Sequence, residues 1–201
     1  MSLSSRSAAR VAVAVVAISG SLLLAGCASK AAPGSTAPAT SSPAAGEETP
    51  TPTPTPTDPP TPVTLTCDQI LTPEQLYAYN PNVGVDAGYA PEKDSLEQKV
   101  KDWQGQTCAW SNQSSGDVIQ IAVAQPPASA MDGLKNAAIT AAQPVPTYGA
   151  PPLEGYFKPG SSGQVQIFRG AWWIVAESTA FFEPGDAAQL MESVLGNLPQ
   201  G

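Results

Sequence analysis

Residues 163–178 read GQVQIFRGAWWIVAES, the stretch that decides the fold. Runs of β-branched and aromatic residues stand on both sides of Arg169-Gly170, which is typical of two strands joined by a tight turn. The segment at residues 155–158 precedes them and is also strand-like. We therefore predict a three-stranded meander made of residues 155–158, 163–169 and 171–178.

The register of the second hairpin of this meander follows from its turn. A turn at residues 169–170 places Ile167 opposite Trp172. It also places Val165 opposite Ile174, so apolar side chains coincide on one face, as a core face requires. The opposite face then carries Gln164, Gln166, Phe168, Trp173, Val175 and Glu177.

Another hairpin is predicted upstream of the meander. Residues 106–112 and 117–125 form two strand-like runs around a polar turn. Because side chains alternate between the faces of a strand, apolar residues two apart share a face. The inward face then carries Cys108, Trp110, Ile119, Ile121 and Val123.

Capping residues and helical spacing predict four helices, over about residues 72–80, 94–104, 130–142 and 184–198. In the second, Leu96, Val100 and Trp103 form the apolar stripe, so Glu97 is expected to face water. The order α-α-β-β-α-β-β-β-α indicates an α+β fold, a single antiparallel sheet of about five strands with helices mainly on one face. The stripe of the last helix consists of Ala187, Leu190, Met191, Val194 and Leu198.

The N-terminus carries an export signal. Arg6 and Arg10 precede an apolar stretch at residues 11–24 that is too short to cross a bilayer stably. Residues 24–27 read LAGC and resemble a lipobox, in which small residues precede an obligatory cysteine. We expect residues 1–26 to be a lipoprotein signal peptide and Cys27 to become the acylated, membrane-anchored N-terminus. A plain secretory signal or an uncleaved anchor would leave Cys27 as a coincidence.

Residues 27–62 have the composition of a spacer. After Cys27, small residues and proline dominate, and threonine alternates with proline at residues 49–57, which favours extended polyproline II. We predict a disordered Pro/Thr-rich linker, whose composition also matches O-glycosylated stalks. The remaining residues, 63–201, are the usual size of one domain with one core, and we expect that domain to be extracytoplasmic.

Two cysteines remain once Cys27 is assigned to the anchor. An exported domain with two thiols usually pairs them, so we predict a disulfide between Cys67 and Cys108. In the chain-entropy model a loop of about 40 residues contributes roughly 4 kcal/mol. Two buried free thiols are the alternative, and a metal site is disfavoured without histidine or a Cys-x-x-Cys pair.

The combination of these features resembles a known family. A lipobox and a Pro/Thr spacer precede CDQILT at residues 67–72, and CAW at residues 108–110 opens a hairpin. This pattern is similar to small actinobacterial cell-envelope lipoproteins of unassigned function. The resemblance implies an N-terminal helix tied by a disulfide to a Cys-x-Trp strand, and a lipid anchor on the outer face of the plasma membrane. It implies no catalytic residues.

Composition argues against several function classes. A net charge of −8 repels phosphate backbones, so nucleic acid is not an expected partner. The absence of histidine removes Ser-His-Asp triads, Cys-His pairs and histidine metal sites. A cell-wall enzyme that uses the carboxylates of Glu154, Glu177 or Glu183 remains an alternative, although isolated acids are usually surface residues. We expect no catalysis, no metal and no cofactor.

The outer face of the meander offers a candidate binding surface. Trp173 and Phe168 lie on it beside Gln164 and Gln166. Aromatic rings stack on sugars and amides hydrogen-bond hydroxyls or extended backbone, so this set suits an envelope protein or a cell-wall component. The alternative is that a helix or the loop at residues 148–152 covers this face and makes Trp173 an ordinary core residue.

The sequence thus predicts a membrane-anchored extracytoplasmic lipoprotein that acts as a noncatalytic binding or accessory module of the cell envelope. Its expected partners are the membrane, through Cys27, and an envelope protein or cell-wall component. A further alternative is an accessory solute-binding lipoprotein of an uptake system, although the usual two-lobed receptor is larger than one domain.

Overall fold

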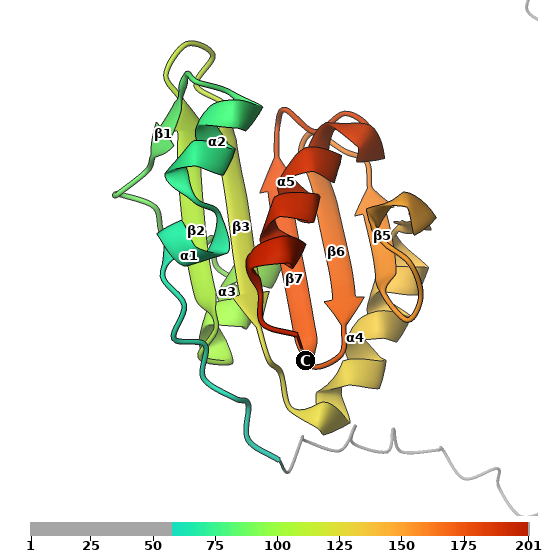
Figure 1. Ribbon diagram of the computed structural model, residues 1–201. Helices are drawn as coiled ribbons and strands as arrows, with labels where there is room; N and C mark the ends of the chain where they lie inside the picture. The colour runs from blue at the N-terminus through green and yellow to red at the C-terminus, as the bar shows by residue number, and fades with distance from the viewer. Residues whose placement is uncertain (1–57, 201) are drawn as a thin grey trace, which may run out of the picture. The chain divides into compact units, whose positions relative to one another are not determined.

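The computed structural model describes residues 58–200. The predicted signal peptide, Cys27 and the spacer up to residue 57 lie outside the described residues. The described chain is an α+β fold, one antiparallel sheet with helices packed against it, as the sequence predicts (Figure 1). None of its helices combines the length and the apolar character needed to span a bilayer.

The sheet has 7 strands in the order β1-β2-β3-β7-β6-β5-β4, rather than about five. The two unpredicted strands are its edges. Both are too short to show an alternating pattern, and β4 contains Pro144, a residue that sheets accept at an edge. The strands are β1 (Val83–Val85), β2 (Gln106–Asn112), β3 (Val118–Ala124), β4 (Gln143–Pro144), β5 (Glu154–Lys158), β6 (Gly163–Arg169) and β7 (Trp172–Ser178).

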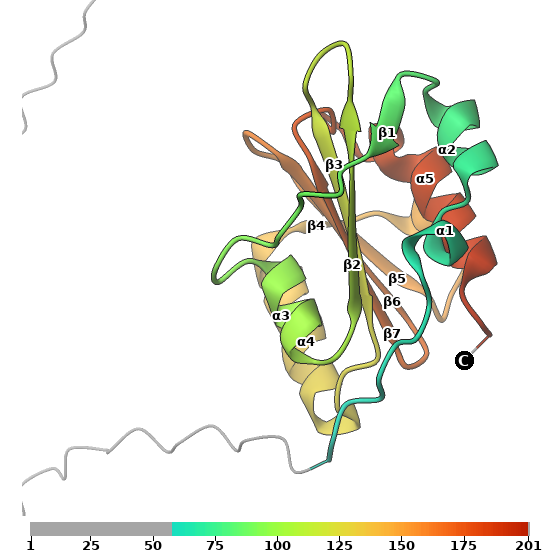
Figure 2. The same ribbon diagram turned by 90° about the vertical axis from the view of Figure 1, so that its left-hand side faces the viewer.

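Helices cover both faces of this sheet. Helices α1, α2 and α5 lie on one face, and α3 and α4 lie on the other (Figure 2). The prediction of helices mainly on one face is wrong because β7, at the centre, is buried on both faces and each face needs a cover. The helices are α1 (Cys67–Ile70), α2 (Pro73–Tyr79), α3 (Leu96–Asp102), α4 (Ala128–Ala141) and α5 (Pro184–Asn197), with a 3₁₀ turn at Pro146–Tyr148.

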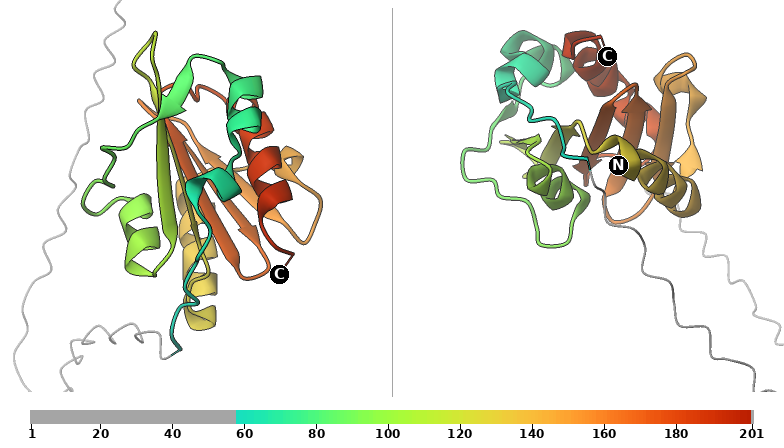
Figure 3. Two further views of the ribbon diagram at one scale, coloured as in Figure 1. Left: turned by 60° about the vertical axis from the view of Figure 1, so that its left-hand side comes forward. Right: turned by 90° about the horizontal axis from the view of Figure 1, so that it is seen from below.

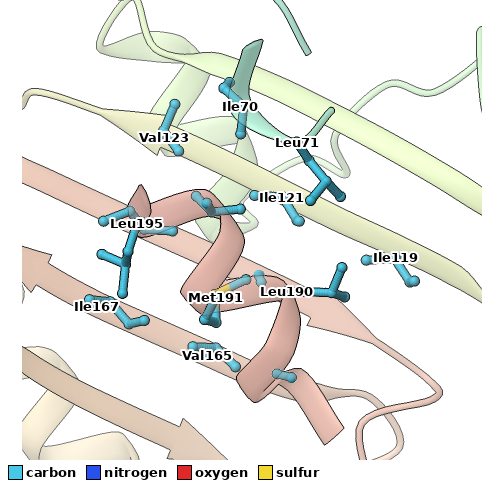
Figure 4. Close-up of a cluster of buried hydrophobic side chains, with 14 of the residues drawn as sticks. Ile70, Leu71, Ile119, Ile121, Val123, Val165, Ile167, Leu190, Met191 and Leu195 are labelled. Carbon is cyan, nitrogen blue, oxygen red and sulfur yellow. The ribbon is translucent and has the colours of Figure 1, made fainter. Parts of the chain in front are cut away.

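The larger core lies between the sheet and α5. The predicted stripe of α5 is confirmed, since every residue of it is buried against this face. Figure 4 shows Leu190 and Met191 above the inward side chains of the central strands. The inward residues of the first hairpin are buried in the same cluster, also as predicted: Cys108, Trp110, Ile119, Ile121 and Val123.

The register of the β6–β7 hairpin differs from the prediction. Arg169 pairs with Trp172, and Ile167 pairs with Ile174, so the turn consists of Gly170 and the residue after it. Gly170 has φ 55°, and the first position of a tight hairpin turn is where glycine supplies a positive φ. The shift is two residues along β7. It changes the partners but keeps every side chain on the face that the sequence predicted.

The predicted disulfide is present and joins α1 to β2. Cys67 and Cys108 are bonded, with their Cα atoms 5.7 Å apart. It therefore ties a helix of one turn, which has little stability of its own, to a strand inside the core.

The segment before α1 also contacts the domain. Thr61 bridges Gln125, and the Val63 N–H donates to the Gln104 carbonyl at 2.9 Å. The N–H and the hydroxyl of Ser129, in the first turn of α4, both donate to Asp58. Figure 3 shows this segment running from α1 to the start of α4. The boundary predicted at residue 63 thus falls within a segment that packs on the domain.

Candidate acidic pocket

The predicted binding surface is buried. Trp173 is 0% exposed and Phe168 is 1% exposed, beneath the layer formed by α3 and α4. The Trp103 ring packs edge-on against Trp173, with 5.7 Å between ring centroids, and Tyr156 packs edge-on against Phe168. The surface prediction is therefore wrong, and the alternative that a helix covers this face is correct.

The amides of that surface are used inside the protein. Gln166 is buried, and its Oε1 accepts a hydrogen bond of 3.2 Å from the Trp173 indole N–H. Gln164 is half-buried, and its Nε2 donates to Glu177 Oε2 at 2.8 Å. The Trp173–Gln166 hydrogen bond satisfies two polar groups that are buried in the core. Gln164 lies with Glu177 in a different part of the same face.

That part is a row of polar side chains across three adjacent strands. Gln120 on β3 is the register partner of Glu177 on β7, and Glu177 is the partner of Gln164 on β6. Tyr89, in the loop before α3, donates its hydroxyl to Gln120 Oε1 at 2.8 Å. The face therefore has an apolar part beneath α3 and α4 and a polar part that hydrogen bonds hold in place.

A cavity of about 280 Å³ lies over this polar row, and we call it the acidic pocket. Ser161 at the tip of the β5–β6 turn and Glu92 before α3 are exposed at its mouth, whereas Glu97 is buried. Residues from four segments of the chain line it: Glu92, Ser95, Glu97, Gln120, Ser161, Ser162 and Glu177.

Glu97 is the unusual member of this set. Only 1% of the residue is exposed, and its Oε1 has no hydrogen-bond partner among the described residues. The sequence predicted that it faces water. Instead Glu97 lies one turn before Val100, on the flank of the stripe that packs against the sheet, so the docking of α3 carries the carboxyl into the pocket.

The electrostatics of the pocket disfavour further negative charge. Burial raises the pKa of Glu97, and the charges of Glu177 and Glu92 act in the same direction. Hydrogen bonds from the Glu97 N–H and from Ser95 oppose this rise in the pKa. Burial and the same three carboxylates also raise the pKa of the Tyr89 hydroxyl. No basic side chain is among the described residues that line the pocket.

Of the three carboxylates considered for catalysis, Glu177 alone lines this pocket. Glu154 forms an ion pair of 2.6 Å with Lys135, which lowers its pKa. Glu183 caps the N-terminus of α5. These two acids therefore have structural partners elsewhere.

Within residues 58–200 no three acidic, histidine or cysteine side chains converge closely enough to hold a metal ion. The arrangement instead offers carboxylate, hydroxyl and amide oxygens around a space large enough for a small organic group. Such a set accepts hydrogen bonds and attracts positive charge.

Comparison of the chain with protein-family models, with curated proteins and with solved structures finds no match. The lipoprotein resemblance therefore rests on its motifs.

Sequence reasoning missed most of the pocket. One signal was present, since Gln120 is the polar residue within the otherwise apolar β3 sequence VIQIAVA. Glu97 gave none, because an acid in the first turn of a helix is ordinarily explained by the helix dipole. The two serines of the β5–β6 turn resemble those of any polar loop.

Proposed function

We propose that this protein is a membrane-anchored extracytoplasmic binding module, without a catalytic step, that takes its ligand in the acidic pocket. The observation that carries the proposal is the buried, unpartnered Oε1 of Glu97 at that pocket.

A carboxyl in this position is costly to the fold. Leaving a buried polar atom without a partner costs about 1–3 kcal/mol, so native proteins contain few such atoms. A leucine or methionine at this point of α3 would extend the apolar stripe of Leu96 and Val100 at no such cost. A ligand that donates the missing hydrogen bond to this carboxyl would offset that cost.

The setting of the module is proposed from the N-terminal sequence. Arg6, Arg10, the apolar stretch and the LAGC motif favour export followed by acylation of Cys27. The Cys67–Cys108 disulfide supports the same compartment, because such bonds persist where the environment is oxidising. The domain would then be tethered by its Pro/Thr-rich spacer to the outer face of the plasma membrane.

An enzyme that cleaves cell-wall glycans is the second candidate, and one observation favours it. Glu97, whose pKa is raised, shares a pocket with Glu177, and glycosidases pair an acid of raised pKa with a second carboxyl. Release of soluble fragments from cell-wall material by the wild type, with loss in both Glu97→Gln and Glu177→Gln, would establish this alternative.

The proposed function is tested in intact cells with a photo-crosslinking amino acid at Ser161, at the mouth of the pocket. The control carries the same amino acid at Ser114, an exposed turn residue that does not line the pocket. We expect adducts from position 161 that disappear when Glu97→Gln is added and are absent from position 114. Adducts that are the same at both positions, or unaffected by Glu97→Gln, would contradict the proposal.

Anchoring is tested with the Cys27→Ala strain. We expect mass spectrometry of the native protein to find an acylated Cys27 at the N-terminus, and the variant to lose that modification. A native protein that retains Met1 would contradict the anchor while leaving the pocket open to test.

A further inference from the structure

The acidic pocket also indicates what class of ligand it accepts. We infer that it binds a primary ammonium group on an unbranched carbon chain, as in a lysine side chain or a short free diamine. This inference rests on the proposed function, because it assumes that the pocket is the binding site.

The sign of the ligand's charge follows from the lining. Glu92, Glu97 and Glu177 bring three carboxyls to one cavity, and none of the described residues that line it is basic. Elsewhere in the domain an acid facing the same sheet has a cation beside it, as Glu154 has Lys135. In the pocket that cation is missing, so a ligand that supplies it relieves the repulsion among the three acids.

The oxygen atoms that line the pocket indicate an organic cation. Metal sites need several ligands at short range, and within the described residues these carboxyls do not form such a group. Quaternary ammonium ions are recognised by cages of aromatic rings, and no aromatic residue is among the described residues that line the pocket. The oxygens of Glu97, Gln120 and the two serines instead require a cation that carries N–H donors.

A primary ammonium matches these oxygens better than a guanidinium does. It is a compact point charge with three rotatable N–H donors, whereas a guanidinium presents a rigid planar fork that favours a bidentate carboxylate. Glu177 Oε2 already accepts from Gln164, whereas Glu97 Oε1 accepts no hydrogen bond from the described residues. Glu177 therefore does not have both oxygens free for a bidentate partner.

The size of the cavity fits this choice. A volume of about 280 Å³ corresponds to about nine water molecules at ~30 Å³ each. An ammonium head with a short alkyl chain fills part of that space and leaves room for bridging water. The exposed mouth at Ser161 and Glu92 lets the far end of the chain reach solvent, where a peptide backbone or a second amine can lie.

Binding of a cation here is linked to the protonation of Glu97. The titratable groups that face it are Glu92 from the preceding loop, Glu177 from β7 and Tyr89, which lies behind Gln120. Burial of Glu97 and the charges of Glu177 and Glu92 raise the pKa of its carboxyl in the empty pocket. A bound ammonium favours the ionised form, so binding strengthens as the pH rises through the pKa of Glu97.

The test is isothermal titration of the full chain, purified from membranes in a neutral detergent. The probes are 1,5-diaminopentane and the blocked lysine Nα-acetyl-lysine methylamide. The comparison compounds are the same blocked derivative of arginine, tetramethylammonium and Mg²⁺. We expect both amines, or one of them, to bind at least tenfold more tightly than every comparison compound. Binding of the diamine alone indicates a free solute, whereas binding of the blocked lysine indicates a polypeptide side chain.

Two variants connect that binding to Glu97. Glu97→Gln keeps the shape of the side chain, removes the ionisable carboxyl and is expected to weaken amine binding at least tenfold and to remove the rise in affinity with pH. Glu192→Gln removes an exposed charge on α5 and is expected to leave affinity unchanged. A melting temperature for Glu97→Gln at or above that of the wild type excludes misfolding as the cause.

The outcomes separate the ligand class from the proposed function. Equal binding of arginine, tetramethylammonium or Mg²⁺, or unchanged amine affinity in Glu97→Gln, would overturn the ammonium assignment. If amines do not bind but Ser161 still yields adducts that depend on Glu97, the ammonium assignment is wrong and the proposed function stands. If both experiments are negative, both are wrong.

Discussion

Replacing Phe168 with alanine tests the layer that α3 and α4 form over the sheet. The ring is 1% exposed and lies edge-on to Tyr156, with 6.1 Å between ring centroids. Deleting a buried phenylalanine side chain costs about 3–5 kcal/mol, because transfer energy is lost and a cavity is left. Phe182 provides the same substitution at a residue that is 82% exposed, where the cost is about 0.5 kcal/mol or less.

The two variants are compared by urea unfolding of the oxidised protein, followed by tryptophan fluorescence and circular dichroism. With an m-value of about 2 kcal/mol per M, the difference of at least about 2.5 kcal/mol separates their midpoints by more than about 1 M. If Phe168 lay on an exposed binding surface, both variants would be as stable as the wild type. Equal midpoints would refute the burial of this face and with it the position of the pocket at its edge.

Three further outcomes are expected. Replacing both Cys67 and Cys108 with serine lowers the free energy of unfolding by roughly 4 kcal/mol, measured by urea unfolding, and no loss would mean that the bond does not restrain the chain. Gly170→Ala is expected to destabilise the protein by about 1–2 kcal/mol, because the φ angle of Gly170 is 55°. Gly133→Ala, in open space on α4, is expected to stabilise it by about 0.5–1 kcal/mol. Thermal unfolding checks both variants, since their melting temperatures should shift in opposite directions. The fold raises the pKa of Glu97 above 4.5, so the ionised carboxyl lowers the stability of the fold as the pH rises from that value. We therefore expect the stability gained by Glu97→Gln to grow between about pH 4 and pH 7. A gain that does not change with pH would contradict this prediction.

The secondary structure was predictable where the periodicity was strong. The four predicted helices and five predicted strands are all present, with ends that differ by a few residues at most. Thr72 caps α2 with Gln75 in the expected capping box, and α5 buries the expected stripe. These features depend on residues a few positions apart, so local sequence is sufficient to specify them.

The edges of the sheet and the coverage of its faces were not predictable in the same way. Strands β1 and β4 are too short to carry a recognisable pattern, and they form where a neighbouring strand offers free backbone groups. Trp173 and Phe168 were assigned to the correct face of β7 and β6, but whether that face met solvent depended on where α3 and α4 docked.

Glu97 shows most clearly that a sequence pattern does not determine whether a side chain is buried. Its position on α3 was correctly assigned, and an acid there normally faces water. This helix packs against β2 and β3, and Glu97 there shares a cavity with Gln120 and Glu177 from distant parts of the sequence. The sequence pattern of a single segment does not predict that these three side chains lie close together.

By itself the sequence determined the order of most helices and strands, the face on which each strand side chain lies, the pairing of Cys67 with Cys108, and the N-terminal motifs that predict an anchor. These follow from chain geometry, from side-chain alternation and from the chemistry of single residues. The tertiary structure alone decided which face is covered and which acids share a cavity. Burial and electrostatic repulsion act between groups that are close in space, and only packing sets those distances.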